Sequence, residues 1–172
     1  MDAQFKVNSY VRYAASGICL VEGITAMTVP GGYRKQDYYV LRPTDNQTSV
    51  IYVPVDNPTM TANMLPVPTK EEIEQTVRSI SKEELSWIDD RKERAETHKE
   101  ILRRCDRREL IILAGSLYLR RQELAANGRK LAGSDELTLR QAERLIDNEL
   151  SFVLGIEPDQ IGGYISSRLG AE

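Results

Sequence analysis

Side chains able to support catalysis are few in this chain of 172 residues. The single histidine, His98, lies in a polar helical stretch with no cysteine or carboxylate at a spacing typical of metal ligands, so a solvent-facing imidazole is expected. Cys19 lies in an apolar strand-like stretch where it is expected to be packed, and neither it nor Cys105 has the neighbours of a nucleophile. No glycine-rich phosphate loop is present. The sequence therefore predicts neither an enzyme nor a metal or cofactor site.

The only tryptophan, Trp87, is the side chain best suited to contact a partner. Residues 91–108, just after it, carry eight bases against four acids, whereas residues 70–90 carry three bases against seven acids. A tryptophan beside a basic stripe can stack on a nucleic-acid base between phosphate contacts. It can also anchor a core, and the stripe can be a solvated helix face with ion pairs such as Glu100 with Arg104. Few apolar positions follow Trp87, which favours an exposed side chain.

The N-terminal third of the chain shows the period-two pattern of short strands. Strands are expected near residues 5–7, 10–13, 18–28, 38–42 and 49–53. Gly23 inside the long strand indicates a bulge or a sharp bend. The pattern predicts a small, strongly bent sheet or SH3-like β-barrel. Prolines then interrupt the pattern, and residues 64–68 are expected to link two domains, 1–66 and 67–172.

The second domain is expected to be a compact bundle of four or five helices, which makes the fold class α+β. Capping patterns mark the expected helix starts at Thr69 with Glu72, Ser81 with Glu84, Asp106 with Glu109, and Thr138 with Gln141. The Ser81 pattern places Trp87 in the second turn of a helix, or at a bend near its start, and this helix is expected to run to about Leu102. Pro158 is expected at the first position of the last helix.

Charge and hydropathy restrict the possible location of the protein. The net charge is −3, no apolar run approaches the roughly 20 residues of a membrane span, and the N-terminus does not resemble a signal peptide. The expected location is the cytoplasm, with both cysteines reduced.

Several motifs together resemble the CarD/CdnL family of bacterial transcription regulators over about residues 5–155. They are Phe5-Lys6-Val7 before Tyr10-Val11, Gly17-Ile18 before Val21-Glu22-Gly23-Ile24, Tyr38-Tyr39-Val40-Leu41, Tyr52-Val53-Pro54-Val55-Asp56-Asn57, Trp87, and Glu149-Leu150. The strand motifs are the most specific part of the resemblance.

The resemblance implies that the first domain is a Tudor-like barrel, also found in transcription-repair coupling factor, which binds the RNA polymerase β subunit through an edge strand. The expected contact residues are Met27, Val29 and Tyr52. Arginine stands at the Met27 and Tyr52 positions in some members, so a more apolar contact is expected here.

The resemblance also implies that the helical domain contacts promoter DNA at the upstream edge of the −10 element. Trp87 would be a minor-groove wedge that stabilises the open complex, and the neighbouring bases Arg91, Lys92 and Arg94 would contact phosphate. Asp89 and Asp90 stand where family members usually carry bases. This departure predicts a weaker or differently aimed DNA contact.

The resulting prediction is a monomeric, non-enzymatic regulator, associated with the nucleoid through RNA polymerase. One alternative is a polymerase-binding interaction module with little or no DNA contact. A protein that binds a small molecule would need a pocket with converging polar groups, which the sequence does not show.

Overall fold

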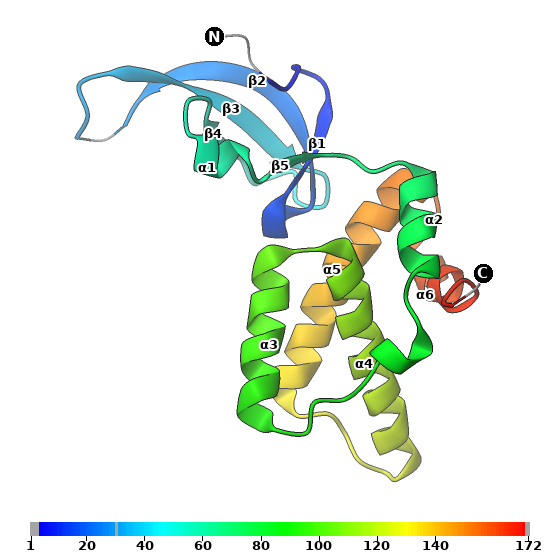
Figure 1. Ribbon diagram of the computed structural model, residues 1–172. Helices are drawn as coiled ribbons and strands as arrows, with labels where there is room; N and C mark the ends of the chain where they lie inside the picture. Colours follow the sequence, from blue (N-terminus) through cyan, green and yellow to red (C-terminus); the bar gives the residue numbers. More distant parts are fainter. Residues whose placement is uncertain (1–3, 30, 171–172) are drawn as a thin grey trace. The chain divides into compact units, whose positions relative to one another are not determined.

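The computed structural model describes residues 4–29 and 31–170, and the chain divides into two compact units, Met1–Val67 and Pro68–Glu172. The first unit contains a five-stranded antiparallel sheet, and helices α2 to α6 form the second (Figure 1). The chain is therefore α+β, and the division falls one residue after the expected boundary at residue 66.

The sheet of the first unit is open. Its strands are β1 (Tyr10–Tyr13), β2 (Ile18–Thr28), β3 (Lys35–Pro43), β4 (Ile51–Pro54) and β5 (Met64–Pro66), in the order β4-β3-β2-β1-β5. β4 and β5 thus lie at opposite edges, and the strand order does not close into the expected barrel. The register of β2 against β3 shifts between Val21 and Gly23, which confirms the bulge predicted at Gly23.

The proline-rich segment expected to link the units begins with a strand. Met64, Leu65 and Pro66 pair with β1 as the edge strand β5. A proline is tolerated at a sheet edge because no further strand requires its missing N–H group. The short helix α1 (Pro58–Thr61), capped by Asn57, precedes this strand.

One face of the sheet carries the core of the first unit, because alternate side chains of each strand point to the same side. Its buried members are Val11, Cys19, Val21, Tyr39, Leu41, Val53 and Met64. The burial of Cys19 confirms that this thiol is a packing residue.

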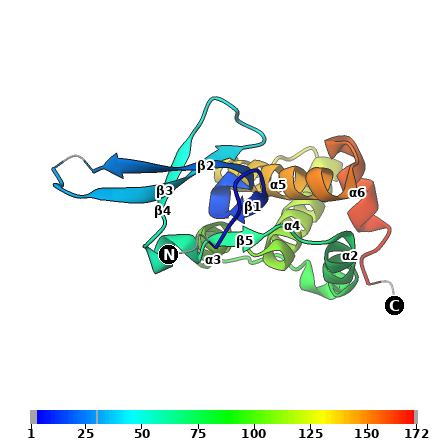
Figure 2. The ribbon, with the colours of Figure 1, turned by 90° about the horizontal axis from the view of Figure 1, so that it is seen from above.

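The outer half of β2 is paired on one side only. β1 pairs in register with residues 18–20 of β2, whereas β3 pairs with β2 as far as Thr28. The end of the β2–β3 hairpin, residues 26–29 and 31–37, is called the hairpin arm below, and Figure 2 shows it projecting beyond the other strands of the unit. The arm is held mainly by its own backbone ladder.

The second unit contains α2 (Lys70–Arg78), α3 (Arg91–Arg104), α4 (Arg107–Ala126), α5 (Gly133–Leu154) and α6 (Pro158–Ser166). Three predicted starts are confirmed: the Thr69 capping box, the Asp106 cap that accepts from the Glu109 N–H at 3.0 Å, and Pro158 at the start of α6. Two predicted starts are wrong. Ser81 precedes only a single 3-10 turn, Lys82–Glu84, and α5 begins at Gly133 rather than near Thr138.

The core of the helical unit lies between α4 and α5, with α2, α3 and α6 packed around them. Leu110, Leu113 and Leu117 of α4 are buried, as are Leu139, Leu145 and Leu150 of α5. Burying each such side chain contributes roughly 1.5–3 kcal/mol. Leu85 and Trp87, in the segment before α3, pack against this core. Within the described residues, no helix is both long and apolar enough to cross a membrane.

Candidate functional site

Trp87 lies in a non-helical segment, residues 85–90, which is called the Trp loop below. Its side chain is partly buried and packs against the core of the helical unit. The guanidinium carbon of Arg94 lies 4.3 Å from the ring centroid and that of Arg120 lies 5.2 Å from it, both within cation–π range. The expectation that Trp87 is largely exposed is therefore wrong, and Trp87 lies in a non-helical segment before α3 rather than in the second turn of a helix.

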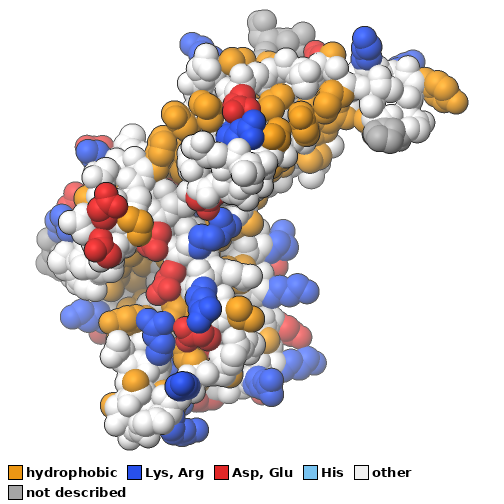
Figure 3. Space-filling view, turned by 180° about the vertical axis from the view of Figure 1, so that it is seen from behind, with side chains coloured by type: hydrophobic (Ala, Val, Ile, Leu, Met, Phe, Trp, Pro, Cys, Tyr) orange, Lys and Arg blue, Asp and Glu red, His pale blue; other side chains and the backbone are white. Residues whose placement is uncertain are grey.

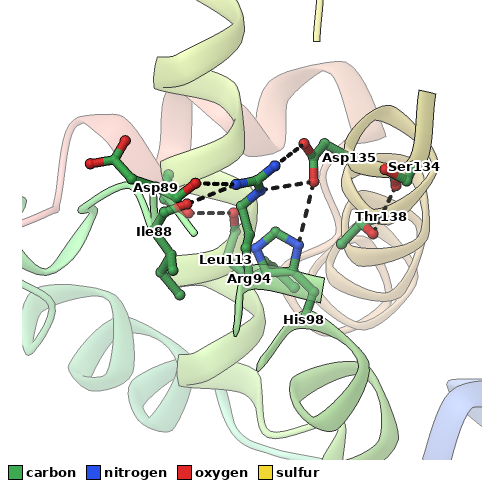
Figure 4. A network of polar contacts seen from close by, with 9 residues as sticks. Ile88, Asp89, Arg94, His98, Leu113, Ser134, Asp135 and Thr138 are labelled. Atoms are coloured by element: carbon green, nitrogen blue, oxygen red, sulfur yellow. Dashed lines mark hydrogen bonds and ion pairs between the residues drawn. The ribbon is translucent and has the colours of Figure 1, made fainter. Parts of the chain in front are cut away.

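Arg94 joins three segments of the helical unit, as Figure 4 shows. Its Nη1 donates to the backbone carbonyls of Ile88 at 2.9 Å and Asp89 at 3.2 Å. Its Nε and Nη2 donate to the two carboxylate oxygens of Asp135 at 3.3 and 3.2 Å. The Arg94 side chain is 10% exposed, and its donors are directed into the protein. The prediction that Arg94 contacts DNA phosphate is corrected: Arg94 holds the Trp loop against the first turn of α5.

His98 lies one helical turn after Arg94 and shares its partner. Its Nδ1 is 3.8 Å from Asp135 Oδ1, and the residue is only 6% exposed, so the expected solvent-facing histidine is wrong. Burial lowers the pKa of His98 more than the nearby Asp135 charge raises it. The imidazole is consequently neutral at pH 7, and it serves as a polar member of the inward face of α3.

Most of the basic side chains in the stripe after Trp87 form ion pairs. Five of its eight bases pair within the helical unit: Arg94 with Asp135, Arg103 with Glu100, Arg104 with Glu109, Arg107 with Glu149, and Arg108 with Glu84. The expected pair of Glu100 with Arg104 is replaced by Glu100 with Arg103. Among the described residues, the stripe leaves three exposed bases without an ion pair, Arg91, Lys92 and Lys99.

Arg91 and Lys92 occupy the first two positions of α3. Asp90 caps the helix by accepting from the Glu93 N–H at 2.8 Å. Positive side chains at a helix N-terminus are disfavoured because the N-terminal end of the helix dipole is itself positive. A locally unfavourable placement of this kind is common at functional sites. The candidate DNA-contacting face consists of Arg91, Lys92, the exposed Asp89 and the partly exposed side chain of Trp87.

The residues expected to face the polymerase lie on the first unit. Val29 is 46% exposed, Tyr52 is 45% exposed, and Met27 is partly exposed. In register, Tyr52 lies opposite Val40 and Met27 opposite Gln36, which puts both on the same face of the sheet. The four-residue offset along β3 corresponds to about 13 Å. These residues form a strip from β4 to the hairpin arm rather than a compact cluster.

Two further features describe the surface of the first unit. Figure 3 shows hydrophobic side chains gathered over the strands on one face, interrupted by a pair of opposite charges. The backbone at the outer edge of β4 and along the outer half of β2 has no neighbouring strand in the sheet order. Such edges are able to pair with a strand of another protein.

Possible metal ligands do not cluster among the described residues. Within residues 4–29 and 31–170, no group of three or more His, Cys, Asp or Glu side chains is placed to hold a metal ion. Cys19 and Cys105 are both buried free thiols, and burial raises the pKa of Cys19 to about 12, which keeps it protonated.

The sequence of the first unit matches a known family. Residues 5–67 match the model of the CarD-like/TRCF RID domain, an RNA polymerase-interacting domain of a protein-interaction rather than catalytic kind. The match ends at the boundary between the two units, so it does not include the Trp loop. The comparison with curated proteins gives no match. Residues 5–67, and with them the N-terminal unit of this chain, therefore belong to the CarD-like/TRCF RID domain family.

Proposed function

We propose that this protein is a transcription regulator that binds the β subunit of RNA polymerase and stabilises the open promoter complex. The family match of residues 5–67 is the observation that carries the proposal. In this proposal the first unit is the Tudor-like docking module and the helical unit is the DNA-contacting part. The protein would act as a monomer in the cytoplasm, on the nucleoid, and without a catalytic step.

The proposed docking contact is strand addition to an open edge of the sheet. β4 and the outer half of β2 present unpaired backbone edges, and Met27, Val29 and Tyr52 lie beside them. In strand addition, main-chain hydrogen bonds supply affinity while side chains of alternate residues supply specificity. Partly exposed apolar side chains next to a free edge fit this type of contact.

The proposed DNA contact uses the edge of Trp87 with Arg91 and Lys92, near the −10 element. Stacking on a base contributes roughly 1–3 kcal/mol. Part of this gain is offset, because a ring that inserts between bases loses cation–π contacts worth about 0.5–2 kcal/mol. The net stabilisation of the open complex by Trp87 is therefore smaller than for a freely exposed tryptophan. Sequence preference would come from the polymerase, since wedging and phosphate contacts depend mainly on DNA shape.

The lifetime of the open complex tests the proposal. Trp87→Ala should shorten it about three- to tenfold, since 1.4 kcal/mol corresponds to a factor of ten. Arg91→Ala and Lys92→Ala should each flatten the dependence of the lifetime on salt, because each lost phosphate contact removes about one released counterion. Lys70→Ala, an exposed base on α2, is the matched control and should change neither property. An unchanged lifetime for Trp87→Ala would contradict the DNA contact.

The acidic pair before α3 provides a test in the opposite direction. Asp90→Asn removes a charge but retains the cap, because asparagine and aspartate cap helices about equally well. Asp89→Asn removes a second charge, from an exposed side chain. The double variant should therefore lengthen the open-complex lifetime, with a loss of stability of only a few tenths of a kcal/mol.

A second candidate function is a polymerase-binding module that makes little or no DNA contact. It is favoured by the cover of Arg94 and Arg120 over Trp87 and by the exposed acid at Asp89. In this case the protein would bind polymerase through the first unit, while Trp87→Ala and Arg91→Ala would leave promoter complexes unchanged. Polymerase binding measured together with open-complex lifetime separates the two functions.

A further inference from the structure

The helical unit contains a hollow of about 590 Å³ bordered by α4, α5, α6 and Leu85. Its walls are largely apolar and include Ile111, Ala114, Tyr118, Leu119, Ile161 and Leu169. A volume of this size lies within the range of roughly 300–1,000 Å³ found for small-molecule sites. Tyr118 and Leu119 also remain exposed, which adds uncovered apolar surface beside the hollow.

α6 leaves room above the hollow because two of its lining residues have no side chain. A Cβ atom built on Gly162 or Gly163 would meet no other atom within 4 Å. At Gly115 on α4, by contrast, an added Cβ would lie 2.9 Å from Leu85, because Leu85 packs directly onto that glycine. The space is therefore open along α6 and bounded by Leu85 at the start of the Trp loop.

Two acids on α5 line the same hollow. Glu143 and Asp147 are four residues apart, so they lie on one side of the helix with like charges close together. Among the described residues, neither forms an ion pair or a hydrogen bond through its side chain, and both are partly buried. Burial, assisted by the nearby Glu143 charge, raises the pKa of Asp147 to about 6. Among the described residues that line the hollow there is no basic side chain, so a cation from outside would complete the site.

We propose that this hollow binds a small organic cation with a hydrocarbon body, an amphiphilic amine, whose ammonium group lies between Glu143 and Asp147. Apolar walls accept the hydrocarbon, and the two carboxylates accept charge-assisted hydrogen bonds from the ammonium. This charge complementarity selects an amine over an alcohol or a carboxylate of the same length. None of the lining residues is assigned to the proposed polymerase or DNA contacts, and the proposal does not depend on them.

The test uses the full chain, with n-octylammonium, n-octanol and n-octanoate as probes, followed by NMR of backbone amides at pH 7.5. Octylammonium should shift the amide signals of Gly115, Gly162 and Gly163, which lie in the walls of the hollow. It should bind about tenfold more tightly than octanol, and octanoate should bind more weakly than either. The charge-assisted hydrogen bonds are the reason for this order.

Matched variants assign the effect to the acids. Asp147→Asn and Glu143→Gln should each weaken octylammonium binding about tenfold and leave octanol binding unchanged, because only the charge is removed. Glu96→Gln, an exposed acid on α3, should leave the dissociation constant of octylammonium unchanged. Both hollow variants keep the size of the side chain, and unfolding curves verify that each variant is folded.

The pH dependence of stability provides an internal check on Asp147. An acid whose pKa is higher in the folded than in the unfolded state costs stability as it ionises. Ionisation of Asp147 should therefore lower stability as pH rises from about 4 to about 6, so the stability of Asp147→Asn relative to the wild type should increase over this range.

Three results would overturn the proposal. They are equal binding of octanol and octylammonium, shifts located away from the three glycines, and unchanged octylammonium binding in both hollow variants. Tighter binding of an amphipathic peptide with a single lysine than of octylammonium would assign the hollow to a protein partner instead, and would overturn the proposal as well.

Discussion

The hairpin arm and the Trp loop were both predicted from the sequence to be exposed contact sites, and they differ in what holds them. The arm is held by the backbone ladder between β2 and β3, so its side chains are free to face outward. Val29 in the arm and Tyr52 on the adjacent strand β4 are indeed nearly half exposed. The Trp loop has no ladder and is held by side chains, chiefly Arg94, which is anchored by Asp135. Where side chains hold a contact site, substituting them also lowers the stability of the fold. Where a backbone ladder holds the site, its side chains can be substituted with little loss of stability.

The largest loss of stability is expected on removal of Arg94, whose side chain holds the Trp loop. Arg94→Ala would leave the Asp135 carboxylate buried without its partner and would remove the donors to Ile88 and Asp89. Breaking a buried ion pair on one side costs about 3–5 kcal/mol. Urea unfolding followed by circular dichroism should show this loss. The control Arg91→Ala, an exposed base on the same helix, should change stability by less than about 0.5 kcal/mol.

Equal stability losses in these two arginine variants would mean that the Arg94 network does not hold the Trp loop. The loop and the hairpin arm would then be equally separable from the fold, and the contrast between them would be lost.

The features that could be predicted from the residues are those fixed by local patterns. The expected contact role of Tyr52 came from the family resemblance rather than from its neighbours. The bulge at Gly23 could be predicted locally, because a glycine inside a strand often marks a bulge. The α+β class and the Asp106 and Pro158 helix starts could be predicted for the same reason, since caps are local. Closure of a barrel requires pairing between remote strands, and the open order of the sheet was not predictable from short motifs.

The environment of Trp87 depends on contacts that no local pattern reveals. α3 has few apolar residues, and this scarcity indicated an exposed tryptophan. Its inward face instead uses Arg94 and His98, whose shared partner Asp135 lies 41 residues beyond Arg94 in the sequence. The only local signal was the four-residue spacing of Arg94 and His98, which puts both on one helix face. The hollow at Glu143 and Asp147 was also missed, because its walls come from three helices.

The second largest loss of stability is expected on removal of the Trp87 ring. Because the ring packs on the helical core and contacts two arginines, Trp87→Ala should lower the free energy of unfolding by about 2 kcal/mol. A fully buried tryptophan would cost about 3–5 kcal/mol and an exposed one close to zero. Thermal and urea unfolding of the same variant would distinguish these cases. A value near zero would put Trp87 in the same class as the residues of the arm.

A smaller effect is expected at the cap between the Trp loop and α3. Asp90→Ala removes the acceptor for the Glu93 N–H and should cost about 1 kcal/mol. Asp90→Asn retains an acceptor at the same position and should cost only a few tenths of a kcal/mol. Chemical unfolding of both variants tests whether the loop is held at its end by the cap as well as by Arg94. If the asparagine variant lost as much as the alanine variant, charge rather than capping would be responsible.

The smallest effect on stability, together with the largest effect on polymerase binding, is expected at Met27 in the hairpin arm and at Tyr52 on the adjacent strand β4. Tyr52 is nearly half exposed on the edge strand β4, and Met27 is partly exposed on the same face of the sheet. Tyr52→Asp and Met27→Asp should each change the free energy of unfolding by less than about 0.5 kcal/mol, because neither side chain fills the core. A charge placed in an apolar contact with the polymerase should nevertheless weaken binding at least about tenfold, measured by titration onto the enzyme. Thr59→Asp, an exposed position on α1, introduces the same charge as a control and should leave binding unchanged.

If polymerase binding persisted in both Tyr52→Asp and Met27→Asp, the docking surface would lie elsewhere on the first unit. If either variant unfolded, the arm would be as tightly coupled to the fold as the Trp loop.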